Sequence, residues 1–206
     1  PTAGLHFTPE VLNQLKELNH TSLEITLHVG AGTFKPVSAA TLQGHAMHEE
    51  TLMIDIRVVE ELCKRLEQNE PIIAVGTTSC RSLESLYWHA LKVEMGLTDI
   101  DDFQVRQWDP YELIPALPAD MVLRNLCKRL RKRGQTGIAG KTALLIAPPY
   151  QYKIIKGLIT NFHQPQSTLL LLVAALVGND WKAIYNEALS NKYRFLSYGD
   201  SSLLLP

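Results

Sequence analysis

Histidine side chains are the most direct candidates for proton transfer in this sequence of 206 residues. His45 and His48 stand three residues apart beside two glutamates, and His28 and His163 follow apolar stretches that we expect to be strands. Imidazole titrates near neutral pH, so these four side chains are candidate acid–base or hydrogen-bonding groups. A metal site is a weaker interpretation, because no H-E-x-x-H or C-x-x-C spacing accompanies them.

Small and polar residues follow three expected strands at the point where each strand ends. The segments are HVGAGT after Leu27, GTTS after Val75 and TNFH after Ile159. Ligands of α/β proteins gather outside the carboxyl ends of strands, so we expect the three segments to line one site. The alternative is ordinary turn chemistry, in which Gly and Thr only reverse the chain.

The GTTS segment leads into an expected helix, whose first N–H groups and positive end would attract a phosphate or a carboxylate. Thr77, Thr78 and Ser79 could add hydroxyl groups to such an anion site. The alternative is that Thr78 or Ser79 only caps the helix. Arg81 and Glu84 lie one turn apart and could pair with each other.

Hydrophobic periodicity supplies the elements that must position these groups. Strands alternate with helices, which predicts an α/β fold with a largely parallel sheet. The segment 96–118 is rich in Asp and Pro and is expected to be a loop or an insertion. The expected helices are 8–18, 58–66, 77–91, 121–132, 165–177 and 181–190, and the expected strands are 22–29, 51–56, 72–75, 142–147, 154–160 and 195–198.

Composition excludes several classes of protein. The chain is 46% hydrophobic and 20% charged with a net charge of −1, which argues against disorder. The longest apolar run, Leu169 to Val177, is much shorter than the roughly 20 residues of a membrane-spanning helix, so we expect no membrane segment. Three widely spaced cysteines, Cys63, Cys80 and Cys127, disfavour a disulfide framework and fit a reducing cytoplasm.

Positive charge is concentrated in one segment. Arg124 to Lys141 holds seven basic residues and no acidic residue. A helix with this charge could bind RNA by neutralising phosphates. The alternative is a solvated helix face.

Six blocks, read in order, resemble one family, the S-adenosylmethionine:tRNA ribosyltransferase-isomerases of queuosine biosynthesis. The segment of about 88–147 resembles the family less well, and we expect it to be a family-atypical insertion. The blocks are PTAGLHFT (1–8), LHVGAGTFKPV (27–37), GHAMHEE (44–50), VGTTSCRSLES (75–85), LITNFHQPQSTLL (158–170) and KYRFLSYGD (192–200).

The resemblance implies that the ribosyl group of S-adenosylmethionine moves to a 7-aminomethyl-7-deazaguanine in tRNA and isomerises to give epoxyqueuosine-tRNA. It implies S-adenosylmethionine as co-substrate, tRNA as partner and no metal. It also implies an α/β barrel-like domain and a small β-barrel domain, of which the second is absent here. Residues 1–206 would then be a fragment of the catalytic domain. The alternative is a divergent relative that binds RNA or a nucleoside without the full reaction.

The resemblance also suggests roles for individual residues. One of His28, His45, His48 and His163 would remove the proton next to the sulfonium. Aromatic side chains such as Phe34, Phe162 and Tyr198 could stack on a base, and Asp200 or Glu49 could bind the substrate amine. The candidate S-adenosylmethionine-binding residues are Gly30, Gly32, Thr33, Phe34, Thr77, Thr78, Ser79, Arg81, Asn161, Tyr198 and Asp200.

Three positions depart from the family pattern. Pro149 stands where the family usually has Gly, Lys156 where it has Asp, and Gln166 where it has Glu. Two carboxylates are thereby lost and one of them becomes a cation. A change of this size in local charge could alter recognition of an amine or a sulfonium.

Overall fold

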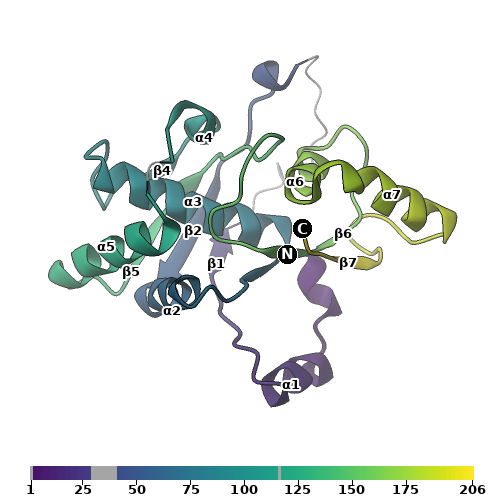
Figure 1. Ribbon diagram of the computed structural model, residues 1–206, viewed down its shortest axis with the longest axis horizontal. Coiled ribbons are helices and arrows are strands. Elements are labelled where there is room, and N and C mark those ends of the chain that lie inside the picture. The colour runs from purple at the N-terminus through teal and green to yellow at the C-terminus, as the bar shows by residue number, and fades with distance from the viewer. Residues whose placement is uncertain (1, 29–40, 116) are drawn as a thin grey trace.

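The computed structural model describes residues 2–28, 41–115 and 117–206, which form two sheets flanked by helices (Figure 1). The four-stranded sheet has the order β1 (Thr26–His28), β2 (Glu50–Asp55), β5 (Gly137–Thr142), β4 (Phe103–Val105). The three-stranded sheet has the order β3 (Ile73–Val75), β6 (Gly157–Asn161), β7 (Ser201–Leu204). The α/β class is therefore confirmed, and the described residues form no closed barrel.

The expected largely parallel pairing is wrong. Only the β3–β6 and β4–β5 pairs are parallel, and the pairs β1–β2, β2–β5 and β6–β7 of the described residues are antiparallel. An apolar run predicts a strand, but it does not state the direction of the neighbouring strand. The sheets are therefore mixed.

Three long helices form most of the layer beside the four-stranded sheet: α2 (Ile56–Glu67), α3 (Thr77–Glu94) and α5 (Ala119–Lys132). α5 packs against both α2 and α3. Its apolar side chains recur at helical spacing, and Val122, Leu123, Leu126 and Leu130 are all buried. The helix expected over 121–132 is thus confirmed.

Shorter helices complete the chain. Thr8 caps α1 (Pro9–Glu17) through a 3.4 Å hydrogen bond from the Val11 N–H, and Pro9 occupies the first turn, as predicted. The others are α4 (Asp109–Glu112), α6 (Thr168–Val177), α7 (Trp181–Ser190) and the 3₁₀ helices η1 (Thr2–His6), η3 (Leu42–Gly44) and η4 (Gly178–Asp180).

Two expected strands are displaced along the chain. The strand expected at 142–147 lies at 137–142, where Gly140 lets the backbone approach Phe103 so closely that a Cβ atom would overlap that side chain. The strand expected at 195–198 lies at 201–204, beyond a loop. The segment expected to be a loop at 96–118 contains the short elements β4 and α4.

Residues Thr168–Ser190 form one stretch that could cross a membrane by length and composition alone. The fold interrupts this stretch, because α6 ends at Val177 and Gly178, with φ at 60°, starts the turn η4. α6 and α7 have ten residues each, or about 15 Å, roughly half of the ~30 Å hydrocarbon core of a bilayer. Neither helix alone is long enough to span it.

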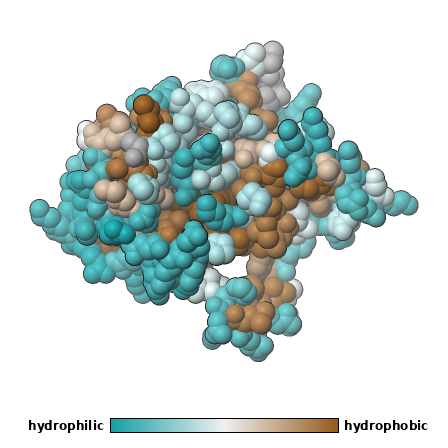
Figure 2. All heavy atoms as spheres, viewed as in Figure 1, coloured by the Kyte–Doolittle hydropathy of each residue, from teal (hydrophilic) through white to brown (hydrophobic). Residues whose placement is uncertain are grey.

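An apolar area occupies the middle of the face in Figure 2, over the region where Figure 1 places β6, β7 and the two termini. Leu203 of β7 and the neighbouring Leu205 are 58% and 59% exposed, and Leu5 of η1 is 70% exposed. β7 is an edge strand of its sheet. In the described part of the chain, exposed apolar side chains therefore lie on and beside this edge strand.

Candidate functional site

The parallel pairing of β3 with β6 brings two of the three strand-end segments together. Val75 is in register with Ile159, and the Gly76 N–H donates to the Ile159 carbonyl at 2.8 Å. The GTTS and TNFH segments therefore leave neighbouring strands at the same edge of the sheet, as predicted. The third segment, HVGAGT, lies outside the described residues apart from His28.

The first turn of α3 has no side-chain cap. Gly76 is the N-cap residue, with φ at 90°, so Thr78 and Ser79 do not cap the helix and that alternative is wrong. Thr77 and Thr78 are buried, and Ser79 is partly exposed. The helix thus begins with backbone N–H groups that no side chain of the helix cap satisfies, next to the TNFH segment.

Arg81, one turn into α3, is buried and pairs with Glu50 at the start of β2. Its Nη1 lies 3.5 Å from Glu50 Oε2, and the two side chains are 3% and 0% exposed. His48 Nε2 lies 3.1 Å from Glu50 Oε1, so the carboxylate joins both groups. Burial lowers the pKa of Arg81, and the Glu50 carboxylate acts against that shift. Arg81 does not pair with Glu84, and its Nε has no hydrogen-bond partner among the described residues.

Glu84, also on α3, is completely buried and connects the helix to the segment before β6. Its carboxylate accepts hydrogen bonds from the Tyr150 hydroxyl at 2.7 Å and from the N–H groups of Lys153, Ile154 and Ile155 at 2.8, 2.9 and 3.0 Å. Burial raises the pKa of Glu84, and these four donors oppose the increase. Sequence spacing suggested a partner one turn away, whereas the real partners are distant in the chain.

His163 is buried beside the end of β6. Its Nε2 lies 2.9 Å from the Thr160 hydroxyl, and its backbone N–H donates to the Tyr185 hydroxyl at 3.1 Å. Burial lowers the pKa of His163 to about 4. The imidazole is therefore neutral at pH 7.

The side chains of Asn161 and Asp200 both form hydrogen bonds to other parts of the chain. Asn161 accepts from the Thr2 hydroxyl at 3.1 Å and donates to the Gly199 carbonyl at 3.2 Å. Asp200 accepts from the Arg194 N–H and Nη2, each at 2.7 Å, and these hydrogen bonds lower its pKa. The Asp200 carboxylate thus closes the loop 194–200 and already has a cation beside it.

The aromatic candidates differ sharply in exposure. Phe162 is buried, with its ring centroid 5.6 Å from that of Tyr185 and 5.3 Å from that of Phe195. It packs in the core and is not placed to stack on a nucleobase. Tyr198 is 92% exposed at the tip of the loop closed by Arg194 and Asp200.

The other candidate histidines, His28, His45 and His48, lie nearer the surface. His28 is exposed at the end of β1, in register with Thr51 of β2, and His45 is partly exposed. The Gln107 side chain holds the segment after His45, since it donates to the His45 carbonyl at 2.7 Å and accepts from the Met47 N–H at 2.9 Å. Sequence reasoning missed Gln107, because no motif marks it.

The structure gives no geometry for four of the candidate S-adenosylmethionine-binding residues. Gly30, Gly32, Thr33 and Phe34 lie outside the described residues.

Within residues 2–28, 41–115 and 117–206, no group of three or more His, Cys, Asp or Glu side chains could hold a metal ion. The family departures at Pro149, Lys156 and Gln166 are all exposed.

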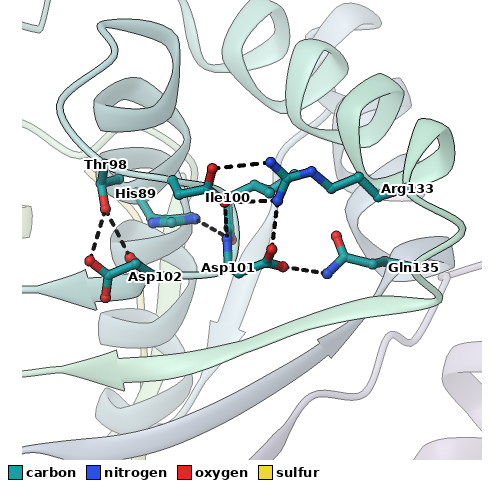
Figure 3. Close-up of polar contacts among 8 residues, drawn as sticks. His89, Thr98, Ile100, Asp101, Asp102, Arg133 and Gln135 are labelled. Atoms are coloured by element: carbon teal, nitrogen blue, oxygen red, sulfur yellow. Dashed lines mark hydrogen bonds and ion pairs between the residues drawn. The ribbon is translucent and has the colours of Figure 1, made fainter.

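Arginines of the basic segment have carboxylate partners. Arg133 Nη1 lies 2.7 Å from Asp99 and 2.6 Å from Asp101, which ties the end of α5 to the loop 98–102 (Figure 3). The other pairs are Arg124 with Glu67 and Asp120, Arg129 with Glu94, and Arg131 with Glu60. Much of the positive charge is therefore balanced by neighbouring elements.

Comparison with known proteins covers nearly the whole chain. The S-adenosylmethionine:tRNA ribosyltransferase-isomerase of Thermotoga petrophila is 38% identical over 206 residues, which is 100% of this chain and 49% of the relative. The enzyme of that name from Trichormus variabilis is 39% identical over 207 residues, with 100% and 40% covered.

A solved structure agrees with these relatives. The crystal structure of S-adenosylmethionine tRNA ribosyltransferase from Thermotoga maritima matches with a TM-score of 0.64 and 33% identity, over 98% of this chain and 51% of that one. The chain spans about half the length of the relatives that it matches. A family model described as queuosine biosynthesis protein matches residues 1–204, and the chain belongs to this family.

Proposed function

We propose that the chain carries the S-adenosylmethionine site of a tRNA ribosyltransferase-isomerase. The reaction would transfer the ribosyl moiety of S-adenosylmethionine to a 7-aminomethyl-7-deazaguanine in tRNA and isomerise it, giving epoxyqueuosine-tRNA. The names of the relatives support this activity. The observation that carries the proposal is the β3–β6 junction, which sets an uncapped helix N-terminus beside a buried, neutral histidine.

The start of α3 suits an anionic part of the substrate. Its first backbone N–H groups and the positive end of the helix favour a carboxylate or a phosphate. Thr77, Thr78 and Ser79 stand in the same turn, and the Arg81 cation lies one turn further on. We assign the methionine carboxylate of S-adenosylmethionine or a tRNA phosphate to this position.

Proton removal next to the sulfonium needs a base, and we propose a histidine for this role. His28, His45, His48 and His163 remain the candidates, and they differ in their surroundings. His48 is hydrogen-bonded to the buried Glu50 carboxylate, whereas His163 faces a hydroxyl group. A carboxylate fixes the orientation of the imidazole that it binds. We therefore propose His48 rather than His163 as the base.

Contacts with tRNA would come from exposed groups. Tyr198 offers an open aromatic face, and base stacking on such a ring is insensitive to sequence. In the segment Arg124 to Lys141, Lys128 and Lys132 are exposed one turn apart on α5, while the arginines are paired. We propose that these two lysines supply the phosphate contacts of the segment, in a protein that acts in the cytoplasm.

The domain assignment is part of the proposal. Residues 1–206 would belong to the catalytic domain of a larger protein, with residues of about 88–147 as a family-atypical segment. Asn161 and Asp200 would shape the site through the loop 194–200, and Gly30, Gly32, Thr33 and Phe34 would complete it.

Release of adenine tests the proposal. The protein is incubated with S-adenosylmethionine and precursor-modified tRNA, and adenine is quantified by chromatography. Release that depends on the tRNA supports the function. Binding of the tRNA without adenine release supports the second candidate, a relative that binds RNA or a nucleoside.

A further inference from the structure

We propose that Thr160 is a positioning residue that fixes His163 as the Nδ1–H tautomer, so that His163 donates a hydrogen bond at the site and does not remove a proton. The identity of the bound ligand rests on the proposed function. The assignment of the tautomer does not.

The contact between the two side chains is short and enclosed. Thr160 Oγ1 lies 2.9 Å from His163 Nε2, and the two residues are 2% and 9% exposed. No other group in the described part of the chain forms a hydrogen bond with Thr160 Oγ1. The Thr160 carbonyl is engaged separately, since it accepts from the Ser202 hydroxyl at 3.0 Å. Among residues 2–28, 41–115 and 117–206, the hydroxyl group therefore has a single partner.

That single partner decides which group donates. If Nε2 carried the proton and donated to Oγ1, the hydroxyl proton of Thr160 would be buried without an acceptor, which costs roughly 1–3 kcal/mol. If the hydroxyl donates to Nε2, its proton is satisfied and the imidazole nitrogen supplies the lone pair. The second arrangement is the more stable one.

The protonation state of the ring completes the assignment. A neutral imidazole carries one proton, and burial keeps His163 neutral at pH 7 by lowering its pKa to about 4. With Nε2 accepting from Thr160, this proton must reside on Nδ1. The backbone is held as well, because the His163 N–H donates to Tyr185 of α7.

Nδ1 is then the ring nitrogen available to a ligand, and its N–H would donate a hydrogen bond to that ligand. Its partner would be an acceptor atom, such as a ribose or carboxylate oxygen or an adenine nitrogen of S-adenosylmethionine. In a buried site, a hydrogen bond becomes stronger as negative charge develops on the acceptor atom. His163 would thus orient the ligand or stabilise a leaving nitrogen, and the base would be another residue.

Nitrogen NMR tests the tautomer without an activity measurement. Long-range ¹H–¹⁵N spectra of the ¹⁵N-labelled chain at pH 7, assigned with His163→Gln, should show a protonated Nδ1 and an unprotonated Nε2. The opposite pattern, or a charged ring, would overturn the proposal. This result stands whether or not the chain releases adenine, so failure of the proposed function is seen separately.

Variants at Thr160 test the positioning role. Thr160→Val keeps the shape of the side chain and removes the hydroxyl, so we expect a mixture of tautomers and about tenfold slower adenine release. Thr160→Ser should restore both. Ser202→Ala is the matched control, because it removes a hydrogen bond to the Thr160 backbone and leaves the hydroxyl in place. An unchanged tautomer in Thr160→Val, or equal losses in all three variants, would refute the role.

Discussion

Arg81 and Glu50 form an ion pair that is almost completely enclosed, with Nη1 and Oε2 3.5 Å apart. Arg81 comes from α3, which follows β3 of one sheet, and Glu50 begins β2 of the other. The pair therefore connects the two sheets directly behind the first turn of α3.

Removal of one partner of this pair should destabilise the fold strongly. Arg81→Met removes the cation that pairs with the buried Glu50 carboxylate, and we expect a loss of about 3–5 kcal/mol in the free energy of unfolding. The double variant Arg81→Met/Glu50→Gln should be less destabilised than the sum of the single variants. Urea unfolding of the four proteins measures the coupling. Additive single effects would show that the two side chains do not interact.

A side chain at Gly76 should strain the start of α3. The φ of 90° is unfavourable for any residue with a Cβ atom, so Gly76→Ala should cost about 1–2 kcal/mol and lower Tm by roughly 2–8 °C. Gly4→Ala is the control, because a Cβ atom added at Gly4 would meet no heavy atom within 4 Å and the backbone there is not left-handed. Equal melting temperatures in calorimetry for Gly76→Ala and the unaltered chain would contradict this account.

Acid should destabilise the chain through a second buried histidine. His89 stacks on Phe103 with ring centroids 4.4 Å apart. Its Nε2 lies 3.3 Å from the Ile100 carbonyl (Figure 3). Burial lowers the pKa of His89 to about 4 from its ordinary 6.5. The unfolded chain therefore binds the proton first as the pH falls. Stability is complete above pH 6.5 and declines towards pH 4, by up to about 1.4 kcal/mol per pH unit for this group.

His89→Asn should flatten that decline. The urea midpoints of the unaltered chain and of His89→Asn are measured between pH 7.5 and pH 4.5. Plotted against pH, the two sets of midpoints should have different slopes only below about pH 6.5. Parallel curves across the whole range would show that His89 does not carry the effect. His163 should contribute a second step of the same sign, because burial lowers its pKa in the same way.

Tyr198 should contribute to tRNA binding without contributing to stability. The side chain is 92% exposed, so Tyr198→Ala should leave Tm unchanged. Loss of one stacked base costs about 1–3 kcal/mol, or roughly fivefold to 150-fold in the Kd for tRNA. Tyr198→Phe keeps the ring and should bind normally in a fluorescence anisotropy titration. Equal affinity of the Ala variant and the unaltered chain would remove Tyr198 from the interface.

Local sequence patterns predicted those helices and strands whose own residues carry a clear signal. Thr8 and Pro9 predict the start of α1, and the apolar residues of α5 recur at helical spacing. The GTTS segment follows a short apolar strand, so the β3–α3 unit and its junction with β6 were predictable from strand ends. Strand β4 has only three residues and no alternation long enough to detect.

Distant partners account for what the sequence did not reveal. Glu84 bonds to a segment near residue 154, and Gln107 holds the chain near His45. No spacing rule connects residues that far apart. The direction of strand pairing has the same origin, since it depends on where the connecting helices return the chain.

The strands of the β3–β6–β7 sheet come from residues 73–75, 157–161 and 201–204. Contacts between such distant segments close large loops, and this loop-closure entropy slows their formation relative to that of neighbouring elements. On a ribosome, α2 and β3 leave the exit tunnel long before β6 can pair with β3. The first turn of α3 is therefore synthesised before His163, and the junction between the two segments forms late in folding.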